Sequence, residues 1–249
     1  MSAAGCVFAE EEAGLLQSVQ QSPDQLSSMI ERRLAGVPLK QIVGWAEFCG
    51  RHILVDPGVF VPRRRTEFLV EQTLALYPPE AVTVDLRCGS GALATVLVAP
   101  RPGAGLVAVD IDPIAVACAR GNLADRVQVL QGDLFAPPPA SLTGRVDIIV
   151  ANAPYVPTDE VEQMPMEARL YEPRALADGG DDCLDVQRRI SAAAPHWLSS
   201  SGCLLVETGQ RQAPQTAEIF ARHGLLPRIL RSEELDATVV LGARERTMP

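Results

Sequence analysis

Residues Val82 to Ala92 read VTVDLRCGSGA, an apolar strand that runs into a Gly-Ser-Gly turn with a helix-like stretch behind it. Such a turn lets the backbone approach a ligand closely, and it aims the free amides of a helix N-terminus at that ligand. The next apolar strand, GLVAVDID, ends in Asp110, about 20 residues further on, where a carboxylate can hold both hydroxyls of a ribose. The two strands together predict a parallel sheet with a nucleoside site at its carboxyl edge.

Two further strands end in polar residues. RVQVLQ, Arg126 to Gln131, is followed by Gly132-Asp133-Leu134, and the strand that begins VDIIV at Val146 runs into Asn152-Ala153-Pro154-Tyr155. Because parallel strands end at one edge of a sheet, Asp85, Asp110, Asp133 and Asn152 are expected to lie along the same edge.

The Asn152 tetrad has the parts needed to hold a planar NH2 group. Asn152 offers an amide oxygen as acceptor and an amide NH2 as donor, Pro154 stiffens the turn, and Tyr155 supplies a flat face with a polar tip. The alternative is an Asn-Pro turn that only closes the strand.

The glycine turn bears on the choice of cofactor. It holds only Gly89 and Gly91, so the dinucleotide pattern G-x-G-x-x-G is incomplete. An acidic sheet edge suits a nucleoside that has a positive centre and no phosphate, which describes S-adenosylmethionine. We therefore favour S-adenosylmethionine over a dinucleotide, although each aspartate by itself could instead serve only to cap a helix.

Taken together, VDLRCGSGALA, VAVDID, GDLF, NAPY and YEPRALADGGDDCLD resemble the release factor glutamine methyltransferase family, whose members methylate a glutamine side-chain amide in peptide chain release factors. The likeness also covers GVPLKQIVGWAEF and VFVPRRRTEFLVE upstream and LLVETGQ downstream. The tetrad alone also occurs in adenine amino methyltransferases, so only the combination indicates glutamine. The resemblance implies an α/β fold with a seven-stranded class I (Rossmann-like) methyltransferase sheet, S-adenosylmethionine as methyl donor, and a release factor as protein partner.

The resemblance also implies roles for individual residues. The catalytic set is Asn152, Ala153, Pro154 and Tyr155, in which the Asn152 side-chain oxygen and the Ala153 carbonyl hold the two substrate N–H groups and Tyr155 packs over the amide plane. The substrate-binding set is Asn152, Tyr155 and Glu67. The cofactor-binding set is Asp85, Arg87, Cys88, Gly89, Ser90, Gly91, Asp110, Ile111, Asp133, Leu134, Asn152, Arg63 and Thr66. We assign no metal ligands, and no general base is needed, because the nitrogen can lose its proton after transfer.

Three features depart from the family pattern. Arg87 stands where the family usually has glycine, so it either pairs with the cofactor carboxylate or points away. Ala153 replaces the first proline of Asn-Pro-Pro-Tyr, for which we expect weaker preorganisation and retained chemistry, because Pro154 still biases Ala153 towards an extended backbone. The amino-terminal helical region is short, which leaves the acceptor open. A small-molecule amide or amine methyltransferase and a degenerate cofactor-binding regulatory protein are therefore the alternatives.

The segment PRRRTE, Pro62 to Glu67, has two interpretations. In the family it forms a wall of the cofactor pocket, and Arg63, Thr66 and Glu67 match that pattern; otherwise it is a helix start that Thr66 caps. Arg64 and Arg65 depart from the pattern and are expected to be exposed.

Composition limits the remaining alternatives. The net charge of −9 over 249 residues disfavours sequence-independent nucleic-acid binding, which depends on neutralising phosphates. A DNA or RNA adenine methyltransferase is correspondingly disfavoured. The six cysteines show neither C-x-x-C pairing nor regular spacing, which is typical of a reduced cytoplasmic protein. No apolar stretch approaches the roughly 18 residues of a membrane helix, and the first residues lack a signal-peptide pattern.

The chain is expected to comprise three parts. Residues 1–40 form a short N-terminal helical region, residues 41–80 a hairpin and linker helix, and residues 81–249 the S-adenosylmethionine-dependent methyltransferase domain. Within the last part, residues 156–180 are expected to be a substrate-facing loop, and residues 202–207 the fifth strand.

Overall fold

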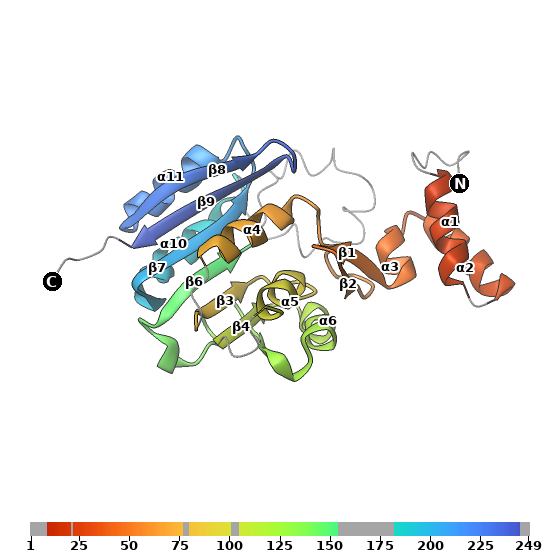
Figure 1. Ribbon diagram of the computed structural model, residues 1–249, viewed down its shortest axis with the longest axis horizontal. Coiled ribbons are helices and arrows are strands. Elements are labelled where there is room, and N and C mark those ends of the chain that lie inside the picture. Colours follow the sequence, from red (N-terminus) through yellow and green to blue (C-terminus); the bar gives the residue numbers. More distant parts are fainter. Residues whose placement is uncertain (1–8, 21, 77–79, 101–104, 154–181, 245–249) are drawn as a thin grey trace.

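A seven-stranded sheet with helices on both faces dominates the computed structural model, which describes residues 9–20, 22–76, 80–100, 105–153 and 182–244 (Figure 1). The strands are β3 (Val82–Leu86), β4 (Gly105–Asp110), β5 (Gln128–Gln131), β6 (Val146–Ala151), β7 (Leu198–Thr208), β8 (Leu225–Ser232) and β9 (Ala237–Arg244). Their order across the sheet is β5-β4-β3-β6-β7-β9-β8.

The strand directions place the candidate site. β5, β4, β3, β6 and β7 are parallel, while β9 runs antiparallel to both β7 and β8. Leu86 at the end of β3 pairs with Val109 of β4 and with Ala151 of β6. The strands carrying the predicted site residues therefore end side by side, and the predicted α/β fold with a seven-stranded class I (Rossmann-like) sheet is confirmed.

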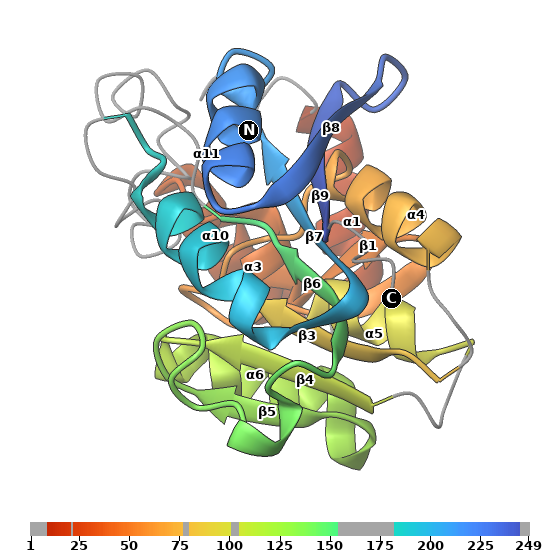
Figure 2. The same cartoon turned by 90° about the vertical axis from the view of Figure 1, so that its left-hand side faces the viewer.

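Helices cover both faces of this sheet (Figure 2). The helices are α4 (Thr66–Leu76), α5 (Ala92–Val98), α6 (Pro113–Leu123), α10 (Asp185–Trp197) and α11 (Ala213–Arg222). Ile148 and Val150 of β6 share a core with α4, α5 and α6, whereas Ile149 and Ala151 share a second core with α10 and α11. Apolar side chains on both faces explain why β6 is almost continuously apolar.

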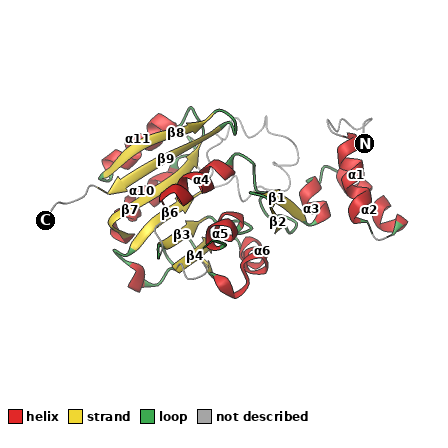
Figure 3. Ribbon diagram, viewed as in Figure 1, coloured by secondary structure: helices red, strands yellow, loops and turns green. Residues whose placement is uncertain are grey.

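The N-terminal part precedes the sheet and has a small core of its own. It consists of α1 (Ala9–Val19), α2 (Pro23–Leu34), α3 (Leu39–Val43) and the predicted hairpin of β1 (Trp45–Phe48) and β2 (Arg51–Leu54). Leu16, Met29 and Ile42 form its apolar cluster. Figures 1 and 3 show α1 and α2 at the end of the molecule away from the sheet, with α3 and the hairpin between them and the sheet.

Two elements differ from the expectation. α3 was not predicted, because its five residues are too few for a helical period to show. β7 begins at Leu198, before the expected Gly202, because Leu198 pairs with Val146 before the register shifts. A Cβ on Gly202 would lie 2.7 Å from the Val146 carbonyl oxygen, so the irregular pairing requires glycine there.

Across the described ranges, no helix has the length and apolarity needed to span a membrane.

Candidate active site

The glycine turn after β3 is tightly packed on one side and open on the other. The Cys88 N–H donates to the Val109 carbonyl at 3.0 Å, and the Gly91 N–H donates to the Cys88 carbonyl at 2.8 Å. Gly91 has φ +73°, and a Cβ there would lie 2.9 Å from Leu123 Cδ1, so only glycine fits against α6. A Cβ on Gly89 would meet no described atom within 4 Å, which leaves space for a ligand to approach the backbone.

Arg87 lies at the start of this turn with φ +60°, in the left-handed region. A non-glycine residue pays about 1 to 2 kcal/mol for that conformation. The backbone therefore explains why a glycine is typical of this position, and the turn keeps its shape with arginine in place.

Asp110 joins the end of β4 to the glycine turn. Its Oδ2 accepts from the Gly89 N–H at 2.9 Å, and its Oδ1 accepts from the Asp112 N–H at 3.0 Å. The carboxylate is 7% exposed, so the backbone donors hold it in one orientation. Ile111, the next residue, has an apolar side chain that is 45% exposed at the same edge.

Asp85 is a carboxyl group buried beneath the turn. It is 2% exposed, and its Oδ2 makes no hydrogen bond within the part of the chain that the structure describes. Burial, and then the nearby Asp110, raise the pKa of Asp85 to about 8, although a backbone hydrogen bond from Ala94 acts in the opposite direction. Burial likewise raises the pKa of the Cys88 thiol well above its usual value, so this thiol packs in the turn in its neutral form.

Asp133 and Leu134 follow β5 at the same edge. Asp133 forms an ion pair with Arg189 of α10, and both side chains are about half exposed. Leu134 is buried with φ +50°, and the next ring, Phe135, stacks on Trp197 at a centroid distance of 5.4 Å. The ion pair was not predicted, because Arg189 belongs to no motif.

Asn152 leaves the end of β6 and reaches α4. Its Nδ2 donates to Thr66 Oγ1 at 3.1 Å, and Ala153 beside it is 1% exposed. Residues 154–181 lie outside the described residues, and so do the predicted roles of Pro154 and Tyr155 and the predicted loop at 156–180.

The PRRRTE segment leads into α4 and lies next to Asn152 at the end of β6. Thr66 begins α4 and contacts Asn152, while Glu67 Oε1 accepts from the Cys49 N–H of the hairpin at 2.9 Å. The Arg63 guanidinium lies over the Phe60 ring at 4.9 Å. Arg64 and Arg65 are exposed, as expected.

Asn122 of α6 is a structural residue of the site that sequence reasoning missed. Its Nδ2 donates to the Leu54 and Ser90 carbonyls, both at 2.9 Å, and its Oδ1 accepts from the Leu54 N–H at 2.8 Å. One amide thereby joins the β1–β2 hairpin to the glycine turn. A polar residue directly before the buried Leu123 is the only sequence signal that points to it.

Glu207 was also missed, although it lies within LLVETGQ. Ala151 of β6 pairs with Val206 of β7. Asn152 is the residue after Ala151 and Glu207 is the residue after Val206, so the two lie next to each other at the same end of the sheet. Glu207 is 1% exposed, which places a buried acidic residue close to the predicted catalytic position.

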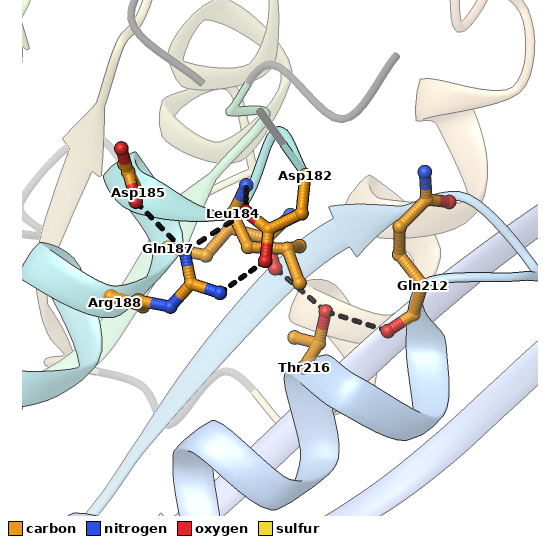
Figure 4. Close-up of polar contacts among 7 residues, drawn as sticks. All are labelled: Asp182, Leu184, Asp185, Gln187, Arg188, Gln212 and Thr216. Atoms are coloured by element: carbon orange, nitrogen blue, oxygen red, sulfur yellow. Dashed lines mark hydrogen bonds and ion pairs between the residues drawn. The ribbon is translucent and has the colours of Figure 1, made fainter. Parts of the chain in front are cut away.

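A polar network fixes α10 and α11 behind the end of β7 (Figure 4). Gln187 is fully buried; its Nε2 donates to Thr208 Oγ1 at 3.4 Å, and its Oε1 accepts from Thr216 Oγ1 at 2.7 Å. Nearby, Arg188 pairs with Asp182 and Asp185, and the hydrogen bond from Arg188 lowers the pKa of Asp182.

The predicted cofactor residues lie where a nucleoside with a positive centre could be accommodated. Asp85 and Asp110 supply acidic groups, Gly89 leaves open space, and Ile111 offers an apolar surface. The buried oxygen of Asp85 without a hydrogen bond in the described chain also suits a positively charged ligand nearby. Among the described residues, no group of three or more His, Cys, Asp or Glu side chains is arranged to hold a metal ion.

Comparison with known proteins adds a family to this geometry. Residues 51–189 match the family model described as methyltransferase small domain. The release factor glutamine methyltransferase of Geobacter sulfurreducens is 40% identical over 209 residues, covering 82% of this chain and 72% of that protein. The release factor glutamine methyltransferase of Mycolicibacterium smegmatis is 39% identical over 199 residues, covering 79% and 70%. A methyltransferase structure from Pyrococcus furiosus has a TM-score of 0.61 at 13% identity, covers 88% of this chain and 98% of that one, and supports the fold alone.

Proposed function

This chain belongs to the release factor glutamine methyltransferase family, and from that starting point we propose that it transfers a methyl group from S-adenosylmethionine to a glutamine side-chain nitrogen in a peptide chain release factor. We propose residues 81–249 as the catalytic domain, preceded by a helical region at 1–40 and a hairpin and linker helix at 41–80. A release factor substrate also favours a cytoplasmic location.

The residues along the sheet edge divide into binding roles. The glycine turn, Arg87 to Gly91, lets the backbone approach the cofactor, and Asp110 accepts hydrogen bonds from ribose hydroxyls with the lone pairs that its backbone donors leave available. The other cofactor contacts that we propose come from Asp85, Ile111, Asp133, Leu134, Arg63 and Thr66. When bound, S-adenosylmethionine supplies an electrophilic methyl group on a positively charged sulfur.

The acceptor side of the site must solve a problem of orientation. The lone pair of an amide nitrogen is delocalised into its carbonyl, so the nitrogen is a poor nucleophile in most directions. Asn152 Oδ1 and the Ala153 carbonyl each accept one substrate N–H, and this fixes the nitrogen in one direction. Holding reacting atoms in line in this way can supply roughly 7 to 11 kcal/mol of the barrier.

The substitution at Ala153 leaves this arrangement intact. The group that accepts the substrate N–H at this position is the backbone carbonyl of Ala153, and every residue has such a carbonyl. Ala153 is also buried at the end of β6. A methylated glutamine retains one N–H and can satisfy only one of the two acceptors. Two acceptors therefore favour a single methylation followed by release.

The contact between Asn152 and Thr66 carries this proposal. It holds an amide side chain at the same sheet edge as Gly89 and Asp110, so that the groups proposed to bind the substrate amide and those proposed to bind the cofactor lie along one edge.

In the part of the chain that the structure describes, His52, His196 and His223 are all exposed. The proposed reaction needs none of them.

The test is a transfer reaction with purified components. The protein is incubated with S-adenosylmethionine and a release factor carrying Gly-Gly-Gln, beside a control release factor carrying Gly-Gly-Glu, and the products are read by peptide mass spectrometry. We expect one methyl group on the glutamine and none on the control. Cofactor binding without transfer to any amide would indicate a regulatory protein, and transfer to small amides alone would indicate a small-molecule methyltransferase; either result rejects the proposal.

A further inference from the structure

Thr66 and Asn152 are 86 positions apart in the sequence and meet at the centre of the candidate site. Asn152 Nδ2 donates to Thr66 Oγ1 at 3.1 Å, and Thr66 is 6% exposed at the first residue of α4. The hydrogen bond joins the end of β6 to the start of a helix that packs on the sheet. Its consequence follows from the chemistry of the amide.

An asparagine side chain has two distinct ends. Its oxygen accepts hydrogen bonds and its NH2 donates them, and a half-turn about the last side-chain bond exchanges the two. With Nδ2 bonded to Thr66, Oδ1 lies on the other branch of the amide and is presented as the acceptor. The Thr66 hydroxyl can accept from Nδ2 or donate to Oδ1, so it fixes where the side chain lies. The observed arrangement, with Nδ2 on Thr66, is the one that turns an acceptor towards a substrate NH2, because two NH2 groups facing each other would both be donors.

We propose that Thr66 is a positioning residue that holds the Asn152 side chain in place at the end of β6, in an arrangement that presents its Oδ1 as an acceptor to an NH2 group. This inference rests on the proposed function, because it concerns how that function selects its substrate. It assigns Thr66 to the acceptor side of the site, in addition to the cofactor-side role that the family pattern implies.

The start of α4 is well placed to hold Thr66. Phe68, Leu69 and Val70 of α4 are buried in the core, and Glu67 Oε1 accepts from the Cys49 N–H at 2.9 Å. The Thr66 N–H also donates to the Arg63 carbonyl at 3.0 Å. The hydroxyl that anchors Asn152 is therefore itself fixed by the core and by the hairpin.

Thr73 provides a matched control on the same helix. Its side chain is fully buried, and its hydroxyl donates to the Leu69 carbonyl within α4 at 2.7 Å. Thr73→Val and Thr66→Val remove the same hydroxyl from the same helix and keep the branched shape. They differ in whether the lost partner is Asn152.

The first measurement is steady-state methyl transfer by these variants and by Thr66→Ser. Thr66→Val should lower kcat by roughly 10- to 100-fold and raise KM for S-adenosylmethionine by a smaller factor, because misplacing Asn152 costs more in chemistry than the loss of one cofactor contact costs in binding. Thr66→Ser keeps the hydroxyl and should stay within about threefold of wild-type kcat, as should Thr73→Val. Equal losses in Thr66→Val and Thr73→Val, or an unchanged kcat in Thr66→Val, would overturn the proposal.

The second measurement needs neither substrate nor activity. In protein labelled with nitrogen-15, the side-chain NH2 of Asn152, assigned by its loss in Asn152→Asp, should exchange with water more slowly than in Thr66→Val or Thr66→Ala. Equal exchange rates would overturn the hydrogen bond itself. If the wild-type protein transfers no methyl group, the proposed function fails, while the exchange rates still decide whether Thr66 holds Asn152.

Discussion

Replacing Asp85 by asparagine should stabilise the ligand-free protein, and the gain should grow as the pH rises from about 4 to about 8. Asp85 is 2% exposed, and its Oδ2 has no hydrogen bond within the described residues. Asparagine has nearly the same shape, and its oxygen can still accept the backbone hydrogen bond from Ala94. The substitution therefore removes mainly the group that ionises.

The sign follows from the raised pKa. Above pH 3.8 the carboxyl group ionises in the unfolded chain, whereas in the folded protein it stays protonated up to about pH 8. Unfolding thus releases a proton in this interval, and the stability contributed by the neutral group is lost as the pH rises through it. Asparagine does not ionise in either state, so its protein escapes this loss.

The magnitude follows from the same two values. A difference of about four pKa units corresponds to at most about 6 kcal/mol, at roughly 1.4 kcal/mol per unit. Relaxation around buried charges usually recovers part of this penalty, so we expect a gain of about 2 to 4 kcal/mol at pH 8 and little at pH 4. Urea denaturation at several pH values, followed by circular dichroism, measures the difference.

Asp112→Asn is the control for the substitution itself. Asp112 is a buried N-cap of α6 whose Oδ1 accepts from the Ile114 N–H at 3.0 Å, so losing its charge should destabilise the helix start. At pH 8 we expect Asp85→Asn to raise the unfolding free energy and Asp112→Asn to lower it. If Asp85→Asn is less stable than wild type at pH 8, or if its effect does not change with pH, the Asp85 charge is already compensated in the ligand-free protein and the reasoning is wrong.

Two further substitutions test the glycine turn. Arg87→Gly relieves a left-handed backbone but gives the unfolded chain more freedom, so the unfolding free energy should change by less than about 1 kcal/mol, and calorimetry should give S-adenosylmethionine affinity within about threefold; a larger loss of affinity would assign the guanidinium to the cofactor. Asn122→Ala removes two side-chain hydrogen bonds to Leu54 of the hairpin and one to Ser90 of the turn, and should lower the unfolding free energy by about 2 to 3 kcal/mol and weaken cofactor binding. Unchanged affinity in Asn122→Ala would show that the turn keeps its shape without this amide.

The sequence predicts the frame of the site well. Asp85, Asp110 and Asn152 each close an apolar strand, and parallel pairing brings such ends together without any knowledge of side-chain contacts. The glycine pattern is also local, since Gly89 and Gly91 both have positive φ angles within the turn itself. These features depend on period and backbone, which a sequence displays directly.

The partners of the site residues cannot be read in the same way. Thr66 holds Asn152 from 86 positions away, Asn122 reaches Leu54 across 68 positions, and Arg189 of α10 pairs with Asp133, which follows β5. Each contact depends on how two packed elements are rotated against each other. No local pattern encodes that rotation, so the residues that position the site emerge only from the structure.

The role of Asn152 in catalysis is tested most directly by comparing methyl transfer to the Gly-Gly-Gln glutamine by Asn152→Ala and by the wild-type protein, with S-adenosylmethionine affinity measured on the same samples. In Asn152→Ala we expect the rate of transfer to fall by at least about 100-fold, while the dissociation constant for S-adenosylmethionine stays within a few-fold of wild type. A variant that binds the cofactor and methylates the glutamine at nearly the wild-type rate would contradict this role.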